Sequence, residues 1–345
     1  MNQTYVGCSL YHLYVSMLLA YEARRNGQKS LMLLINDRVP DVESLIPGLK
    51  KIGVFDDIVA VKAYSILTDF KKNLGTVNYL FNRQNGLVSI YEKNNPELLK
   101  RDSFIRDSQI NMFHIVRTRA YFLIKFPNNY FRMVEEGFQT YHHKMPILRY
   151  LKRKYLIKFP ILMGHDPQVK EVLVQHPEKL RDDVLRSKGK KLDLERLQRE
   201  LTHEQRQDVL ECFLGQRPDY SGSGKFLLIT QPLSEDGIVS EKQKVSVYAK
   251  AIEAAKVAGY DVYLKTHPRE FTKYADLFKD VKFIPQLFPI EVFNLDPDYK
   301  FEVGLTVFSG SLDNLSNVQN KITLGRDILS NTDEFLKKEL VIPAI

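Results

Sequence analysis

The sequence predicts an α/β protein with two domains, each built on a doubly wound parallel sheet. Its 345 residues suggest roughly two domains of about 150 residues each. The chain opens with a pattern of strand, helix and strand, and the same alternation returns after a Gly-, Pro- and Ser-rich segment at 215–224. We therefore expect domains at 1–215 and 216–345, with the boundary in that segment.

The first domain begins with a short strand, a helix whose apolar residues recur at helical spacing, and a second apolar strand. The Asn26-Gly27 pair is a helix stop signal. The strand, helix, strand order implies parallel pairing through a crossover helix. Residues 168–211 are charged and are expected to be helical. The expected elements are strands at 3–8, 30–35, 55–61, 87–90 and 121–124 and a helix at 10–25.

The second domain shows the clearer alternation. Its first helix places Val245, Ala249, Ile252 and Ala255 on one face and stops near Gly259. Ligands of such sheets bind at the carboxyl ends of the strands, and two such domains are expected to face each other across a cleft. The expected elements are strands at 225–230, 260–265, 281–284 and 302–308 and helices at 244–257, 271–278 and 327–340.

The composition excludes several classes of protein. With 44% hydrophobic and 27% charged residues, the chain lacks the bias of disordered, collagen-like or disulfide-stapled sequences. Two cysteines, Cys8 and Cys212, cannot form a four-thiolate metal cluster, and a reducing cytoplasm is expected. The apolar stretch at 15–20 is too short for a membrane span and lacks the flanks of a secretory signal. We expect a cytoplasmic protein.

The segment 144–158 carries the strongest local charge bias, within a chain of net charge +8. Its basic residues alternate with apolar ones, and no acidic residue interrupts them. This pattern is typical of a surface that binds anionic lipid or a polyanionic glycan, and equally of a solvated helix face. We expect peripheral contact with an anionic membrane here. The basic residues are Lys144, Arg149, Lys152, Arg153, Lys154 and Lys158.

Three expected strands of the second domain end in polar residues. Thr266-His267-Pro268-Arg269 follows one strand, next to Lys265, and a protonated His between cations suits a departing phosphate. A second His-Pro pair at 176–177 has no clear strand before it, so position separates the two pairs.

The strand at 302–308 runs into Ser309-Gly310-Ser311, whose hydroxyl and backbone N–H groups can bind a phosphate. The alternative is that Ser311 only caps a helix.

The third strand end holds Thr230, Gln231 and the acidic pair Glu235-Asp236 before Gly237. Adjacent carboxylates raise each other's pKa, which can prepare one of them as a general base. Polar residues at three strand ends of one sheet predict a binding site at that edge.

Two other acidic motifs are weaker candidates. Glu135-Glu136-Gly137 repeats the acidic pattern in the first domain, although acidic residues are common in surface turns. Asp296-Pro297-Asp298 has the form of a metal site in sugar transferases, but no other ligand is evident nearby, and we expect no metal.

The order of the second-domain motifs resembles that of the bacterial sialyltransferases of glycosyltransferase family 52, the lipooligosaccharide sialyltransferase group. In that group an acidic-acidic-Gly motif precedes a His-Pro motif and a Ser-containing motif, as in TQPLSEDG, KTHPRE and VFSGS here. In the first domain only the opening strand and helix match. The resemblance implies a GT-B-type fold, a CMP-sialic acid donor, inversion at the anomeric carbon, and no required cofactor or metal.

The resemblance also implies roles for residues and partners. Asp236 would be the base, His267 the phosphate partner, and Ser309 and Ser311 phosphate-binding groups. Glu235 stays open as the base. Glu135 and Glu136 also stay open, because related capsule polysialyltransferases carry the acidic motif in the first domain. The acceptor would be a glycan of lipooligosaccharide or capsule, bound by the first domain; a homodimer stays open. The remaining residues expected to contact the donor are Thr230, Gln231, Lys265, Pro268, Arg269 and Gly310.

Two alternatives remain. The motifs do not read the sugar directly, so a related transferase with another nucleotide sugar fits them as well. The second alternative, a nucleic-acid-binding protein, is suggested by the sequence pI of about 9.1. We expect no nucleic-acid partner, because the basic residues form one short patch without an aromatic RNA-binding motif.

Overall fold

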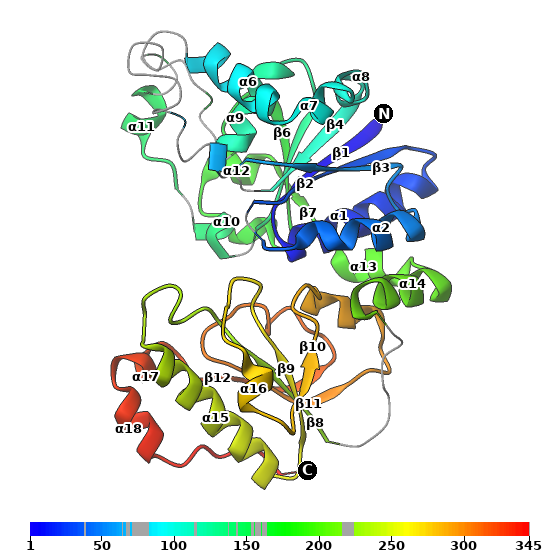
Figure 1. The fold of residues 1–345 in the computed structure, drawn as a ribbon. Coiled ribbons are helices and arrows are strands. Elements are labelled where there is room, and N and C mark those ends of the chain that lie inside the picture. Colours follow the sequence, from blue (N-terminus) through cyan, green and yellow to red (C-terminus); the bar gives the residue numbers. More distant parts are fainter. Residues whose placement is uncertain are drawn as a thin grey trace. The chain divides into compact units, whose positions relative to one another are not determined.

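The computed structural model describes residues 1–37, 39–63, 65–66, 70, 83–113, 116–136, 138–142, 144–152, 155, 160, 164–215 and 224–344. The chain divides into two compact units, Met1–Leu201 and Thr202–Ile345. Helix α14 (His203–Leu214) packs against the 3₁₀ helix Ile290–Leu295 and so belongs to the second unit, whereas the sequence placed the boundary at residue 215. Each unit is an α/β layer structure on a parallel sheet, as predicted (Figure 1).

The first unit holds a seven-stranded sheet in the order β3-β2-β1-β4-β5-β6-β7, with every pair parallel. Its strands are β1 Asn2–Gly7, β2 Ser30–Ile35, β3 Asp57–Val61, β4 Ser108–Met112, β5 Phe131–Val134, β6 Val169–Val174 and β7 Gly189–Lys191. Its helices are α1 Leu10–Arg25, α2 Ile46–Ile52, α6 Arg83–Asn94, α7 Pro96–Leu99, α8 Asp102–Arg106, α9 Val116–Lys125, α10 Phe138–His142, α11 Ile147–Leu151, α12 Asp183–Ser187 and α13 Leu194–Arg199, with 3₁₀ helices at Val42–Leu45 and Pro177–Lys179.

The opening of this unit follows the prediction. Strand β2 is buried on both faces, which explains its continuous apolar run. Helix α1 starts at Ser9, whose hydroxyl accepts the N–H of His12, and it ends at Asn26 before Gly27, which has a φ of +69°.

Two predicted strands of the first domain are wrong. Residues 87–90 lie in α6 and residues 121–124 in α9, and these helices pack together through stacked rings of Tyr91 and Tyr121, whose centroids are 4.2 Å apart. Leu87 and Tyr91 are buried four residues apart, which is helical spacing. Strands β4, β5, β6 and β7 were not expected. Strand β6 (VKEVLV) lies in the charged region that was predicted to be helical.

The second unit holds a five-stranded sheet in the order β10-β9-β8-β11-β12, again with every pair parallel. Its strands are β8 Lys225–Ile229, β9 Asp261–Lys265, β10 Lys282–Ile284, β11 Phe301–Thr306 and β12 Val318–Thr323. Its other helices are α15 Glu241–Val257, α16 Tyr274–Leu277, α17 Asp327–Ser330 and α18 Thr332–Lys337. The predicted helix 327–340 is therefore two short helices, and β12 was not expected.

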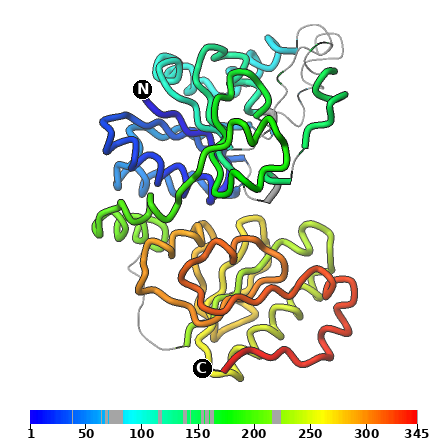
Figure 2. The backbone as a smooth tube through the Cα atoms, turned by 180° about the vertical axis from the view of Figure 1, so that it is seen from behind, coloured from blue at the N-terminus to red at the C-terminus, as the bar shows by residue number. Residues whose placement is uncertain are grey.

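Helix α15 begins with a capping box, in which Ser240 and Gln243 each bond the other's backbone N–H. It packs on β8 and β9 and contacts α18 (Figure 1). The end of the chain returns to the start of β9 (Figure 2). There the Tyr260 hydroxyl donates to the carbonyl of Pro343. These contacts close one face of the second sheet.

A glycine in β11 shapes the loop at residues 309–311, which follows the strand and is called the serine loop below. A Cβ at Gly304 would lie 2.6 Å from Leu312 Cδ1 and 2.8 Å from Val318 Cγ1. The missing side chain lets Leu312 fold back onto its own strand, which places Ser309 and Ser311 at the carboxyl edge of the sheet.

Some sequence predictions fall outside the described residues. These are Gly137, most of the Gly- and Pro-rich segment (216–223), and positions 153–154 and 156–158 of the basic segment. Within the described part of the chain, no helix has the length and apolar character needed to cross a membrane.

Candidate active site

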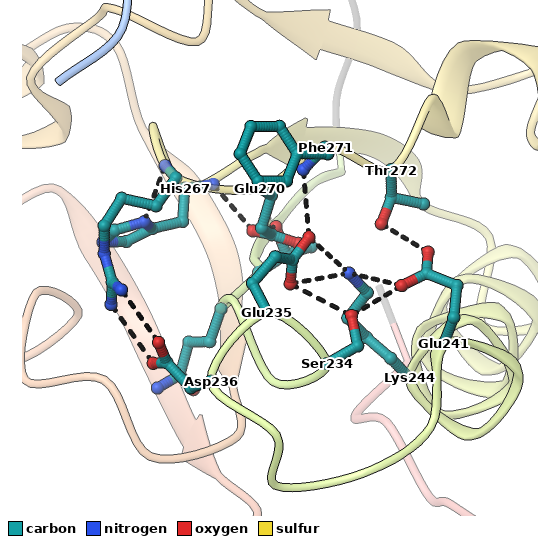
Figure 3. Close-up of polar contacts among 12 residues, drawn as sticks. Ser234, Glu235, Asp236, Glu241, Lys244, His267, Glu270, Phe271 and Thr272 are labelled. Atoms are coloured by element: carbon teal, nitrogen blue, oxygen red, sulfur yellow. Dashed lines mark hydrogen bonds and ion pairs between the residues drawn. The ribbon is translucent and has the colours of Figure 1, made fainter.

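Strands β9, β8 and β11 are neighbours in the second sheet, so their carboxyl ends meet at one edge. This arrangement brings together the three polar strand ends that the sequence singled out, which begin at Thr266, Thr230 and Val307. Figure 3 shows the loops after β8 and β9, where most of the candidate side chains lie.

His267 lies in the turn after β9. Its Nδ1 accepts the backbone N–H of Arg269 at 3.1 Å, which leaves the ring proton of the neutral imidazole on Nε2. Burial lowers the pKa of His267 to about 4, and the charges of Arg269 and Lys265 add to this effect. The ligand-free imidazole is therefore neutral at pH 7, not protonated as the sequence suggested, and Nε2 is a hydrogen-bond donor.

Arg269 binds Asp236 through two parallel hydrogen bonds. Nη1 lies 2.8 Å from Oδ1, and Nη2 lies 3.1 Å from Oδ2. The bond to Arg269 lowers the pKa of Asp236, so this carboxylate is ionised over the whole neutral range. Both of its oxygens face a guanidinium in the ligand-free protein. An anion that drew Arg269 away would release Asp236.

Glu235 turns to a different cation (Figure 3). Both of its oxygens lie 2.9 Å from the ammonium of Lys244, which is fully buried, and Oε1 also accepts the N–H of Phe271. Burial acts to raise the pKa of Glu235, but the bonds from Phe271 and Lys244 outweigh it and lower the pKa. The expectation that the adjacent acids raise each other's pKa is therefore wrong, because each acid has its own cation.

We expect Lys244→Met to destabilise the protein by about 3 kcal/mol, because it leaves Glu235 without its buried counterion. The bonds from Phe271 and Lys244 lower the pKa of Glu235 below 4.5, so the stabilisation by this ionised carboxylate is present above pH 4.5 and disappears as the pH falls through the lowered pKa. Urea unfolding at pH 7 measures the loss. Lys242→Met, an exposed neighbour on the same helix, is the control; equal stability of the two variants would contradict a stabilising pair.

Three residues expected to contact the donor are buried and support the loops instead. The Thr230 hydroxyl donates to Glu270 Oε1 at 2.5 Å. Gln231 Oε1 accepts the N–H of Phe308 at 2.8 Å and so ties the serine loop to β8. The Lys265 ammonium donates to the carbonyls of Thr266 and Gln286, and burial lowers its pKa to about 8. We revise their expected role from donor contacts to positioning of the strand ends.

The serine loop lies at the predicted edge of the sheet, but Ser311 does not start a helix, which was the alternative interpretation. Ser309 Oγ accepts the N–H of Ser311 at 3.2 Å, and Gly310 between them is exposed. Residues 310–314 form turns rather than a helix, so the interpretation of Ser311 as a helix cap is wrong. Pro268 is half-buried in the turn after His267.

The acidic pair of the first unit follows β5. Glu135 is buried and accepts hydrogen bonds from the hydroxyls of Tyr11 and Tyr141 and from both the N–H and the side-chain amide of Gln175. Glu136 is half-buried, and its Oε1 lies 3.9 Å from Nε2 of the buried His12. Glu135 therefore accepts four hydrogen bonds within its own unit, and Glu136 is the more accessible acid of this pair.

The second His-Pro pair also follows a strand. His176 comes two residues after β6, so the sequence was wrong to separate the two pairs by position. The surroundings separate them instead. The His176 side chain is 52% exposed, and its Nδ1 lies 3.3 Å from Glu178 Oε1. It follows a strand of the first unit's sheet, whereas His267 follows a strand of the second unit's sheet.

Asp296 Oδ1 accepts the N–H of Asp298 at 3.1 Å, which is an Asx turn. Among the residues that the structure describes, no group of three or more His, Cys, Asp or Glu side chains could hold a metal ion.

The sequence of the whole chain identifies the class of enzyme to which these residues belong. The model of glycosyltransferase family 52 matches residues 53–325, and the chain belongs to this family. An uncharacterized protein of Haemophilus influenzae is 28% identical over 256 residues, which cover 71% of this chain and 81% of the relative.

The fold is similar to that of solved structures. The α/β-galactoside α-2,3-sialyltransferase of the luminous marine bacterium Photobacterium phosphoreum has a TM-score of 0.57 at 14% identity, over 93% of this chain and 89% of that one. The UDP-GlcNAc 2-epimerase of Neisseria meningitidis has a TM-score of 0.51 at 11% identity, over 99% and 95%. These likenesses confirm the GT-B-type α/β fold, and the family match confirms a glycosyltransferase.

Proposed function

We propose that this protein is an inverting sialyltransferase that transfers sialic acid from CMP-sialic acid to a hydroxyl of a surface glycan, of lipooligosaccharide or capsule. One observation carries the proposal: in a family 52 chain, the Nε2–H of His267 lies at a strand end beside Arg269, at the same sheet edge as the serine loop. The sialyltransferase fold of the Photobacterium protein supports it.

The reaction requires two groups. The acceptor oxygen forms a bond to the anomeric carbon while the bond from that carbon to the phosphate oxygen breaks, and the electron pair stays on CMP. Asp236 takes the proton of the acceptor hydroxyl, and the Nε2–H of His267 stabilises the charge on the departing phosphate. Inversion requires the acceptor to approach the face of the sugar opposite the phosphate.

Donor binding prepares both groups. A phosphate near His267 offsets the neighbouring cations that depress its pKa, so the imidazole becomes a better proton donor to the leaving group. The same phosphate competes with Asp236 for the guanidinium of Arg269. Loss of that ion pair raises the pKa of Asp236 and makes it a stronger base.

Isothermal titration with CMP, UMP and single-stranded RNA tests the proposal. We expect heat of binding with CMP and little with the other two. Preferred binding of UMP would favour the transferase with another nucleotide sugar, and preferred binding of RNA would favour the nucleic-acid-binding protein.

We expect transfer to proceed in EDTA, because a single phosphodiester leaves and protein donors (His267 and Arg269) lie where pyrophosphate enzymes often hold a divalent ion. Turnover with and without chelator measures this. If EDTA stopped the reaction and Mn²⁺ restored it, Asp296 and Asp298 would have to be considered as metal ligands.

We also propose peripheral contact with anionic lipid through the basic segment, which would keep a cytoplasmic enzyme near its acceptor. The side chains of Ile147 and Leu148 are 72% and 79% exposed, beside the exposed Lys144, Arg149 and Lys152. Sedimentation with phosphatidylglycerol vesicles and not with phosphatidylcholine vesicles is expected. Binding that is unchanged in the Ile147→Ser, Leu148→Ser double variant would argue against this surface.

A further inference from the structure

The turn that carries His267 has the geometry of a helix start. The carbonyl of His267 accepts the N–H of Glu270 at 3.0 Å, and the N–H of His267 donates to Glu270 Oε1 at 2.8 Å. The His267 side chain accepts the N–H of Arg269, and Pro268 occupies the first position after it. This pattern is a variant of the capping box, in which the side chain of the first residue accepts the N–H of the second helical position instead of the third, with Pro at the first helical position.

No helix follows this box. Residues 271–273 are not helical, and α16 begins only at Tyr274. The hydrogen bonds of this turn therefore do not serve to start a helix. Here the residue in the capping position is an imidazole at the edge of the candidate active site, so the bonds fix the direction of that ring.

Glu270 connects this turn to the rest of the unit. Its side chain is buried, with an exposed fraction of 5%, and the hydroxyl of Tyr274 donates to Oε2 at 2.7 Å. Oε1 also accepts from Thr230 at the end of β8. The amide of Gln286 donates to the carbonyls of His267 and Glu270 at 3.1 Å each. The turn is therefore held from β8, from α16 and from the loop after β10.

We infer that Glu270 is a positioning residue, which holds the backbone of His267 so that Nδ1 accepts the N–H of Arg269 and Nε2–H faces outward. The inference rests on the proposed function for the role of His267 in transfer, but its structural part does not. Without an acceptor at Oε1, the N–H of His267 loses its partner and the turn opens. Nδ1 can then carry the proton, and the imidazole presents an acceptor where a leaving phosphate needs a donor.

Two substitutions of similar size separate a hydrogen-bond role from a packing role. Glu270→Gln keeps an acceptor for the N–H of His267, and the Tyr274 hydroxyl can rotate to accept from the new amide. We expect kcat within about tenfold of the wild type. Glu270→Met has no acceptor, and a misplaced imidazole is expected to lower kcat about 10²-fold with a smaller change in KM for the donor.

Tyr274→Phe is the matched control. It removes a bond to the same carboxylate without touching the turn of His267. A purely structural Glu270 predicts kcat losses that follow the loss of stability in both Tyr274→Phe and Glu270→Met. A positioning Glu270 predicts that Tyr274→Phe lowers the melting temperature but retains kcat.

The tautomer of His267 gives a readout that needs no activity. In ¹⁵N NMR at pH 7, the ring proton of the wild type and of Glu270→Gln is expected on Nε2. The imidazole of Glu270→Met is expected as a mixture of two neutral tautomers, one with the proton on Nε2 and one with it on Nδ1. A wild-type ring with its proton on Nδ1 would overturn the inference even if Glu270→Met failed to fold. So would a folded Glu270→Met with wild-type kcat and an unchanged tautomer. Because this measurement requires no nucleotide, a protein that failed to bind CMP would refute the proposed function and leave the positioning role to be decided by NMR.

Discussion

Replacement of His267 by alanine is expected to lower kcat for sialyl transfer by about 10²–10³-fold, the usual effect of losing one donor to a developing charge. The N–H of Arg269 donates to Nδ1 of this imidazole, which leaves the ring proton on Nε2 as the donor to the departing phosphate. Its side chain is only partly buried, so the fold should persist. Initial rates with CMP-sialic acid, together with circular dichroism, measure both effects.

His176→Ala is the matched control, since it alters the other His-Pro pair on an exposed turn of the first unit. It should retain wild-type kcat. Equal losses in both variants, or full activity in His267→Ala, would remove His267 from the reaction.

Asp236→Asn is expected to lower kcat by about 10²–10⁴-fold, because an amide cannot take the acceptor proton. The affinity for CMP should not fall, because the amide of the variant binds Arg269 more weakly than the carboxylate does and so competes less with the phosphate for the guanidinium. Single-turnover transfer and CMP titration separate these two quantities.

The other acids serve as controls for the base. Glu235→Gln and Glu135→Gln should lower kcat far less. Glu235 is paired with Lys244, and the carboxylate oxygens of Glu135 already accept hydrogen bonds from residues of its own unit. A fully active Asp236→Asn enzyme, alongside an inactive Glu136→Gln variant that still binds CMP, would move the base to the first unit.

The sequence predicted the fold best where local pattern and tertiary packing agree. Strands β1, β2, β8 and β9 are short, mostly buried segments bounded by helix and turn signals, and they form as expected. Residues 87–90 and 121–124 have the same short apolar runs, but they pack helix against helix, which a run of four residues does not reveal. Strand β6 was missed because its Lys170 and Glu171 are half-buried or exposed and give the segment a charged character.

The candidate site was predictable in outline. Polar residues after strands identified the edge of the sheet, because parallel strands bring their carboxyl ends together. The direction of each side chain was not predictable: Gln231 and Lys265 turn inward to bond neighbouring loops, a choice made by tertiary contacts. Glu270 was missed, although its place three residues after His267, with Pro268 between them, is the spacing of a capping box.

A donor screen decides whether this enzyme transfers sialic acid or another sugar. The protein is incubated with CMP-sialic acid, UDP-sugars and GDP-sugars, each with galactose-terminated oligosaccharide acceptors, and the released nucleotide and the product mass are measured. A CMP-sialic acid-dependent enzyme releases CMP, makes an acceptor heavier by one or more sialic acid residues, and does not turn over the other donors; this is the result that we expect. Release of UDP or GDP with transfer of another sugar, while CMP-sialic acid stays intact, would contradict it.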